Sequence, residues 1–94
     1  MNTDNAINTF DTCFVTATNG FVWVCKKAHQ DAHFLHLTEA RIVRTWGTTE
    51  GLAQLYANPL KETILDRKTP IVSVAWHAVI SILPVSSQGW EKHL

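Results

Sequence analysis

An Asn-Gly step between two runs of β-forming residues constrains the fold of this chain more than any other feature. Asn19-Gly20 follows the run TCFVT at residues 12–16 and precedes the run FVWVC at residues 21–25, and both runs consist mainly of β-branched and aromatic residues. Asn-Gly favours the tight turns that join antiparallel strands. The pattern therefore predicts a β-hairpin near the N-terminus.

The length of the hairpin loop decides how the two cysteines of the chain are placed. With a two-residue loop, Cys13 opposes Lys26 and Cys25 opposes Phe14, so the two sulfur atoms point to opposite faces. With a three-residue loop over residues 18–20, Cys13 opposes Cys25 directly. Both alternatives stay open. In a reducing compartment we expect both cysteines to be small buried side chains.

The rest of the chain alternates short β-rich runs with polar connections too short for a parallel crossover. Strands are predicted at residues 33–37 and 41–46, separated by a reversal or bulge at 38–40, and residues 71–83 form one bent strand or two short ones. Leu52, Leu55 and Tyr56 have helical spacing. The fold class is therefore α+β, mainly β: a curled antiparallel sheet or small open barrel of about five strands, with one short helix at about residues 49–57.

The length and composition indicate one globular domain over residues 1–94, with 46% apolar residues. We expect residues 1–9 and 86–94, which are mostly polar, to be flexible or to dock on a neighbour.

Eight basic and eight acidic residues give a formal net charge of zero. Without a basic stripe, nonspecific binding to nucleic acid is not expected. The N-terminus has no signal-peptide pattern, and no apolar stretch is long enough to span a membrane, so we expect a cytoplasmic protein without a membrane partner. Four tryptophans and the lack of charge repulsion favour a homo-oligomer.

Three closely spaced histidines raise the alternative of a zinc site. His29, His33 and His36 would share one face of a helix, as a zinc site requires. Their context favours strands joined by a turn, which puts His33 and His36 on opposite faces. The zinc-dependent protein is therefore the minor alternative, and we expect no metal and no cofactor.

Catalytic patterns are weak in this sequence. Cys13 or Cys25 could pair with His77, but neither cysteine stands at a helix N-terminus or in a strained turn. The carboxylates are scattered, and the four glycines form no phosphate-binding loop. We therefore predict that the protein is not an enzyme.

Several motifs together resemble a family of small phage- and prophage-encoded proteins of unassigned function. The residues that carry the resemblance are Gly20 and Phe21; Leu37, Ala40 and Arg41; Trp46; Leu52 and Leu55; and Val79, Ile80, Ile82 and Pro84. It spans roughly residues 14–85. The chain departs from the family pattern at Thr45 and Gly47, which flank Trp46. The resemblance implies a phage accessory protein that acts on the host during infection.

The expected function is that of a non-enzymatic binding protein of the anti-defence type. It would block a host protein or sequester a small anionic ligand such as a signalling nucleotide. The candidate ligand-binding residues are Arg41, Arg44, Trp46, Trp76 and His77, because aromatic rings can stack on a base and arginine can bind phosphate. The alternative is a structural or assembly oligomer of phage origin.

Overall fold

Five extended passes of the chain form an antiparallel sheet in the computed structural model, which describes residues 8–49 and 51–94. Bends divide these passes into eight strands. They are β1 (Asn8–Phe10), β2 (Cys13–Ala17), β3 (Val22–Cys25), β4 (Lys27–Gln30), β5 (Phe34–Thr45), β6 (Ile64–Leu65), β7 (Thr69–Ala75) and β8 (Val79–Pro84). The mainly β, antiparallel fold predicted from the sequence is confirmed. The strands expected at residues 33–37 and 41–46 form the single strand β5, and the segment expected at residues 71–83 forms two strands, β7 and β8.

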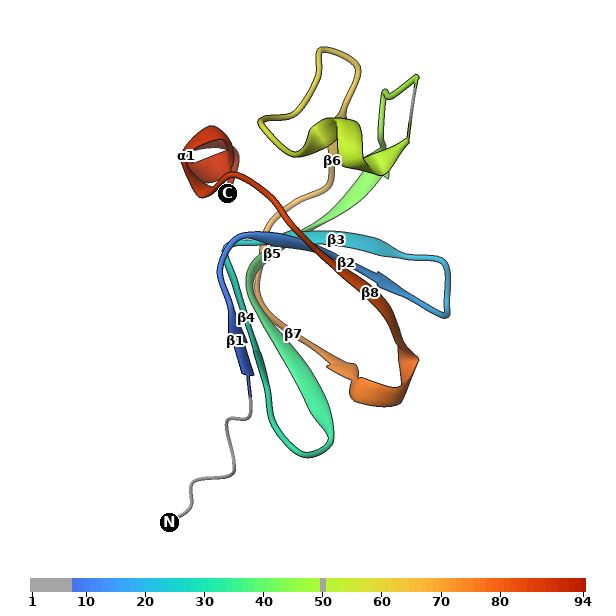
Figure 1. Cartoon of the computed structure of the whole chain (residues 1–94), viewed down its shortest axis with the longest axis vertical. Coiled ribbons are helices and arrows are strands. Elements are labelled where there is room, and N and C mark those ends of the chain that lie inside the picture. The colour runs from blue at the N-terminus through green and yellow to red at the C-terminus, as the bar shows by residue number, and fades with distance from the viewer. Residues whose placement is uncertain (1–7, 50) are drawn as a thin grey trace.

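The sheet curls into a half-barrel because its long passes bend between two halves (Figure 1). One half has the strand order β1-β4-β5-β7, and the other has β8-β2-β3-β5-β6. β5 belongs to both halves. The pass that contains β1 and β2 crosses from one half to the other at Asp11-Thr12, and the pass that contains β3 and β4 crosses at Lys26.

The hairpin predicted at Asn19-Gly20 joins β2 to β3 through the three-residue loop. The N–H of Ala17 donates to the carbonyl of Phe21, and Gly20 has a φ of 87°, a left-handed conformation that suits glycine. The register therefore pairs Cys13 with Cys25, whose Sγ atoms are 3.7 Å apart, and both cysteines are free and buried.

The break expected at residues 38–40 is a bend inside one continuous strand, β5. Glu39 has a φ of 52°, and the register with β7 is the same on either side of it: Thr38 pairs with Ile71, and Ala40 pairs with Thr69. Leu35 and Leu37 face the inside of the half-barrel before Glu39. The left-handed backbone at Glu39 interrupts the alternation of side chains along the strand, so Ala40 faces inward in place of Glu39.

The inner core fills the concave side of the half-barrel. Its buried members are Cys13, Val15, Ala17, Trp23, Cys25, Ala28, Leu35, Leu37, Ala40 and Val74. Alternation along the strands supplies most of these side chains, since every second residue of β2, β4 and β5 points inward.

A second, outer core covers the convex side of β2, β3 and the end of β5. Its buried members are Phe14, Val22, Val24, Val43, Leu55, Val85 and Trp90. Three helical segments accompany it: η1 (Leu52–Leu55), α1 (Ser87–Trp90) and η3 (Glu91–His93). The short helix expected at about residues 49–57 is the single 3₁₀ turn η1, which lies beside α1 at one end of the molecule (Figure 1).

The C-terminal tail, residues 86–94, was expected to be flexible or to dock on a neighbour, and it instead packs on its own domain. Trp90 is fully buried, its ring meets Phe14 edge-to-face at 5.2 Å, and its Nε1–H donates to the carbonyl of Leu55 at 2.9 Å. A tryptophan buries a large apolar area when its N–H finds an acceptor, and the outer core offers both. Of the other segment expected to be flexible, residues 1–7 lie outside the described residues, and Asn8 and Thr9 belong to β1.

The described helices are short, and none of them combines the length and the apolar character that a membrane span needs.

Candidate functional site

The outward side of β4, β5 and β7 is the part of the sheet that the outer core leaves open. We call it the histidine face. It consists of Lys27 and His29 on β4, Phe34, His36 and Thr38 on β5, and Ile71 and Ser73 on β7. All of these residues are exposed or half-buried, so the face is accessible from solvent.

A chain of short hydrogen bonds crosses the histidine face. The Nε2 atom of His36 lies 2.7 Å from Oδ2 of Asp31, and the Nδ1 atom of His36 lies 2.7 Å from Oγ of Ser73. An ionised carboxylate only accepts hydrogen bonds, so Nε2 carries the proton that points at Asp31. In the neutral ring Nδ1 is then the acceptor, and the Ser73 hydroxyl donates to it.

The turn after β4 holds the Asp31 carboxylate in place. Its Oδ1 atom accepts the backbone N–H of His33 at 2.9 Å and that of Phe34 at 2.8 Å. The hydrogen bond from His36, followed by these two backbone N–H groups, lowers the pKa of Asp31 well below the usual carboxylic acid range. Asp31 is therefore ionised and oriented at neutral pH.

Strand pairing brings His36 and Ser73 together. They are direct partners in the β5–β7 register. The N–H of Trp76 donates to the carbonyl of His33, which sets the phase of the ladder and makes His36 and Ser73 a non-hydrogen-bonded pair. Side chains approach most closely at such pairs. Leu35, Leu37 and Val74 point into the inner core, so their neighbours His36 and Ser73 point outward.

Two of the three clustered histidines lie side by side on this face. His29 pairs with His36 across β4 and β5, with ring centroids 5.4 Å apart, whereas His33 lies in the connecting turn. Within residues 8–49 and 51–94, no group of three or more His, Cys, Asp or Glu side chains has a geometry that could hold a metal ion. Both ring nitrogens of His36 already have partners.

The two arginines expected to bind a ligand make contacts within the fold. Arg41 donates from Nε to the carbonyl of Asp66 at 2.8 Å and from Nη1 to the carbonyl of His93 at 3.0 Å. These bonds connect β5 with the C-terminal segment. Arg44 is 67% exposed and forms an ion pair from Nε to Oδ1 of Asp66 at 2.6 Å. One aspartate thus engages both guanidinium groups.

The remaining expected ligand residues lie at opposite ends of β5. Trp46 directly follows the C-terminal end of β5, near Arg44. Trp76 and His77 belong to η2 (Trp76–Ala78), which follows Ala75, the partner of Phe34 at the other end of β5. Both tryptophans are more than one-third exposed. The five predicted residues therefore do not form one site.

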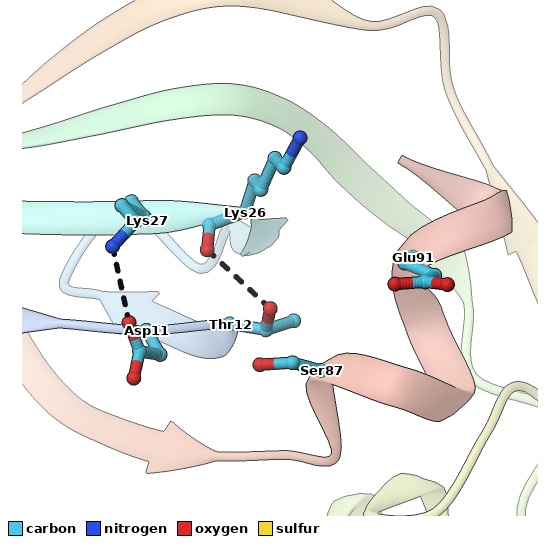
Figure 2. Close-up of a pocket in the computed structure, with 6 residues that line it drawn as sticks. All are labelled: Asp11, Thr12, Lys26, Lys27, Ser87 and Glu91. Carbon is cyan, nitrogen blue, oxygen red and sulfur yellow. Dashed lines mark hydrogen bonds and ion pairs between the residues drawn. The ribbon is translucent and has the colours of Figure 1, made fainter.

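A small hollow lies where the bend between β1 and β2 and the bend between β3 and β4 meet the C-terminal helices (Figure 2). Its volume is about 180 Å³, and it is lined by Asp11, Thr12, Lys26, Lys27, Ser87 and Glu91. Asp11 and Lys27 form an ion pair at 3.3 Å, and the Thr12 hydroxyl donates to the carbonyl of Lys26. Pockets for drug-sized ligands are usually larger, so the hollow is a weaker candidate site than the histidine face.

β7 presents a free edge beside the histidine face. Among the described strands, β7 pairs only with β5. Because Trp76 hydrogen-bonds towards β5, the ladder alternation directs the N–H groups of Ile71, Ser73 and Ala75 away from β5, towards the free edge. β7 contains no charged residue, and Ile71 is 62% exposed.

The free edge of β8 is less regular than that of β7. Pro84 lacks an N–H, and the pairing with β2 shifts register so that Ile80 bulges out, 66% exposed. The other described strands with a free edge, β1 and β6, have three and two residues. β7 is therefore the longest regular edge that another strand could join.

Comparisons with protein-family models, with curated proteins and with solved structures found no match for this chain.

No motif in the sequence singles out Asp31, His36 and Ser73 as a set. Ser73 stands between Val72 and Val74, and His36 between Leu35 and Leu37. This alternation indicates that both polar side chains point outward. Which strand pairs with which, and in what register, is not contained in that local signal.

Proposed function

We propose that this protein is a non-enzymatic binding protein that pairs, through the free edge of β7, with an extended segment of another protein. The observation that supports the proposal most directly is the unprotected edge itself. Natural proteins protect exposed edges with charges, prolines, bulges or covering segments. β7 contains one proline, Pro70, near its start, and residues 71–75 beyond it direct three N–H groups outward with no charged residue or proline among them. Strand addition to such an edge is a common mode of peptide recognition.

The flanking side chains indicate what the partner segment would resemble. Exposed apolar groups lie along the edge: Ile71 on β7 itself, Phe34 beside Ala75, and Trp76 just beyond. A partner strand with few charges and with apolar residues at alternate positions fits them best, because its side chains would pack against these three.

Sequestration of a small anionic ligand is the less favoured form of the proposal. Arg41 donates to two backbone carbonyls, and Arg44 is paired with Asp66. Trp76 and His77 lie at the other end of β5. An anion would therefore have to displace an existing ion pair and would meet only part of the expected residue set.

The proposed origin of the gene and the proposed partner rest on the sequence resemblance to phage and prophage proteins. We propose that the gene is of phage or prophage origin and that the partner is a host protein in the bacterial cytoplasm. The alternative is an assembly oligomer, in which β7 of a second copy supplies the added strand.

Native mass spectrometry of the tagged protein, purified from cells that carry its gene, tests the proposal. We expect a bound partner chain in the wild type. Ile71→Lys places a charge on the edge, and Ala75→Pro removes an outward N–H at a residue whose φ of −56° already suits proline; both should lose the partner. Ile80→Lys is the matched control, because Ile80 is equally exposed on the other edge, and it should keep the partner.

Each outcome of this measurement separates the alternatives. A bound mass equal to one further copy, lost in Ile71→Lys, would favour the assembly oligomer. A nucleotide-sized mass that disappears in Arg44→Ala would favour sequestration. A partner kept by Ile71→Lys and Ala75→Pro would exclude the edge of β7 as the binding surface.

A further inference from the structure

The hydrogen-bond chain on the histidine face has the arrangement of an activated nucleophile. It contains a hydroxyl, Ser73 Oγ, at 2.7 Å from a ring nitrogen of His36 and a carboxylate, Asp31, at 2.7 Å from the other ring nitrogen. This order of nucleophile, base and orienting acid defines serine-type acyl transfer, and it is recognised by geometry rather than by position in the sequence. Here Ser73 meets Nδ1 and Asp31 meets Nε2.

We propose that Ser73 is a nucleophilic serine, with His36 as its general base and Asp31 as a positioning residue, and that the site reacts with small activated esters. The proposal does not rest on strand addition, and a strand added to β7 would occupy the N–H of Ser73 and so compete with the reaction. It would replace the expectation that the protein has no catalytic activity. Substrates are small because the face is open, and the hollow beside α1 is lined by other residues.

The reaction follows from the proton positions. Ser73 Oγ attacks the ester carbonyl carbon while its proton moves to Nδ1 of His36. The bond between that carbon and the alkoxy oxygen breaks, and the leaving oxygen takes the proton from His36, which leaves an acyl group on Ser73. Water then attacks this acyl group and gives a proton to Nδ1, and Ser73 Oγ leaves and recovers that proton. The products are an alcohol and a carboxylic acid.

The free edge supplies a hydrogen-bond donor next to the nucleophile. The N–H of Ser73 points away from β5, and no described strand pairs with that edge. A backbone N–H beside the reacting hydroxyl can donate to the oxygen that becomes negative during the attack. The ring of Phe34 lies 6.0 Å from the His36 ring, measured between centroids, and offers an apolar surface for the acyl group.

The other cross-strand hydroxyl pair lacks these features and provides a matched control. Oγ1 of Thr16 and Oγ of Ser81 lie 2.6 Å apart on β2 and β8, and both residues have some exposure. The hydrogen bonds of this pair include no histidine. Ser81 should therefore react like an ordinary serine.

The first test is acetylation by p-nitrophenyl acetate, followed by mass spectrometry of the intact chain and of its peptides. We expect an acetyl group on Ser73, none on Ser81, and no Ser73 adduct in Ser73→Ala. His36→Gln should slow acetylation of Ser73 about 100-fold, the lower end of the usual contribution of a general base. Equal labelling of Ser73 and Ser81, or an unchanged rate in His36→Gln, would overturn the proposal.

The role of Asp31 has a spectroscopic readout that a purely structural role would not change. We expect ¹⁵N NMR of the wild type to show His36 protonated at Nε2, and Asp31→Asn to shift the ring towards the Nδ1–H form. An Nδ1–H ring in the wild type would overturn the assignment of His36 as the base.

A cysteine version keeps the proposal testable if His36→Gln does not fold. Ser73→Cys should be alkylated by iodoacetamide at pH 6 at least about tenfold faster than Ser81→Cys, because a neighbouring imidazole that accepts the proton favours the thiolate. The reaction forms a carbon–sulfur bond and releases iodide. Equal rates for the two variants would contradict the proposal.

Discussion

Single side chains on the outward side of this sheet have well-defined hydrogen-bond roles. One carboxylate, Asp31, accepts the N–H groups of His33 and Phe34 and a ring N–H of His36. It therefore closes the turn between β4 and β5 and also sets the orientation of the His36 ring. Asp31 thus both shapes the turn and positions the His36 ring.

The charge of Asp31 should make stability depend on acidity. Its pKa is lowered in the folded chain, first by the hydrogen bond with His36 and then by the two backbone N–H groups. A lowered folded pKa means that the stabilisation is complete above the unfolded pKa, roughly pH 4, and is lost as the pH falls through the folded value.

Urea unfolding of the wild type and of Asp31→Asn, measured from pH 7 down to pH 2, tests this dependence. The wild type should be the more stable at pH 7, and the difference should shrink below about pH 4. The asparagine can still accept the backbone N–H groups, so the comparison leaves the turn intact and removes the charge together with the hydrogen bond that the carboxylate accepts from His36. A difference that stays constant over this range would contradict the assignment.

The two buried thiols should be unreactive in the folded protein. The hydrogen bond between the Cys13 and Cys25 sulfur atoms, together with burial, raises the pKa of the Cys25 thiol. Alkylation requires the thiolate and access from solvent. We expect iodoacetamide to react at least about 100-fold more slowly with the native chain than with the urea-unfolded chain, since an opening that costs a few kcal/mol slows the reaction by that factor. Rapid native labelling would show that the inner core opens easily.

Among the elements, the C-terminal helix α1 depends on a close backbone approach. A Cβ atom added at Gly89 would overlap the carbonyl oxygen of Ala57. The Ser86 side chain accepts the N–H of Gly89 at 3.1 Å and caps the helix. Small size, rather than an unusual φ, is therefore what this position requires of its residue.

Gly89→Ala should lower the free energy of unfolding by about 1–3 kcal/mol, because backbone atoms must move to relieve the overlap. Gln88→Ala, at the exposed neighbouring position, is the control and should stay within about 0.5 kcal/mol of the wild type. Thermal unfolding followed by circular dichroism measures both. An unperturbed Gly89→Ala variant would show that α1 is not held against residue 57.

The elements also show how far the sequence predicts the structure. Side-chain alternation and the Asn-Gly turn are sufficient to predict the antiparallel, mainly β fold. They also leave two possible partners for Cys13, and one of the two, Cys25, is the partner in the structure. They could not place the tail, because a mostly polar segment with one tryptophan looks mobile until an apolar surface that fits the ring is known. They also could not assemble the chain from Asp31 to Ser73, since that contact depends on the pairing of β5 with the distant β7.

For the whole molecule, two cores share one sheet. Neighbouring residues of β2 face opposite ways: Phe14 points into the outer core, and Val15 points into the inner core. Losing either core would uncover one side of the same strands. The two cores should therefore unfold together rather than in separate steps.

Substitutions in each core test this coupling. Trp90→Ala in the outer core and Leu35→Ala in the inner core should each lower the free energy of unfolding, by about 3–5 and 2–5 kcal/mol. Tyr56→Ala, at a position that is more than half exposed, should change it by less than about 1 kcal/mol. Each variant should keep one transition, with fluorescence and circular dichroism coinciding. A second transition in Trp90→Ala would show that the outer core is an independent layer.

The double coverage of β2 and β3 also determines where exchange of backbone protons with solvent is slowest. These two strands have packed side chains on both faces and a hydrogen-bonded neighbour on each side. Their amides can reach water only when the whole domain opens. β7 has a free edge and an uncovered outer face, so half of its amides can exchange from the native state. β7, which carries Ser73 and the proposed binding edge, is therefore less protected than β2 and β3, which lie on the far side of β5.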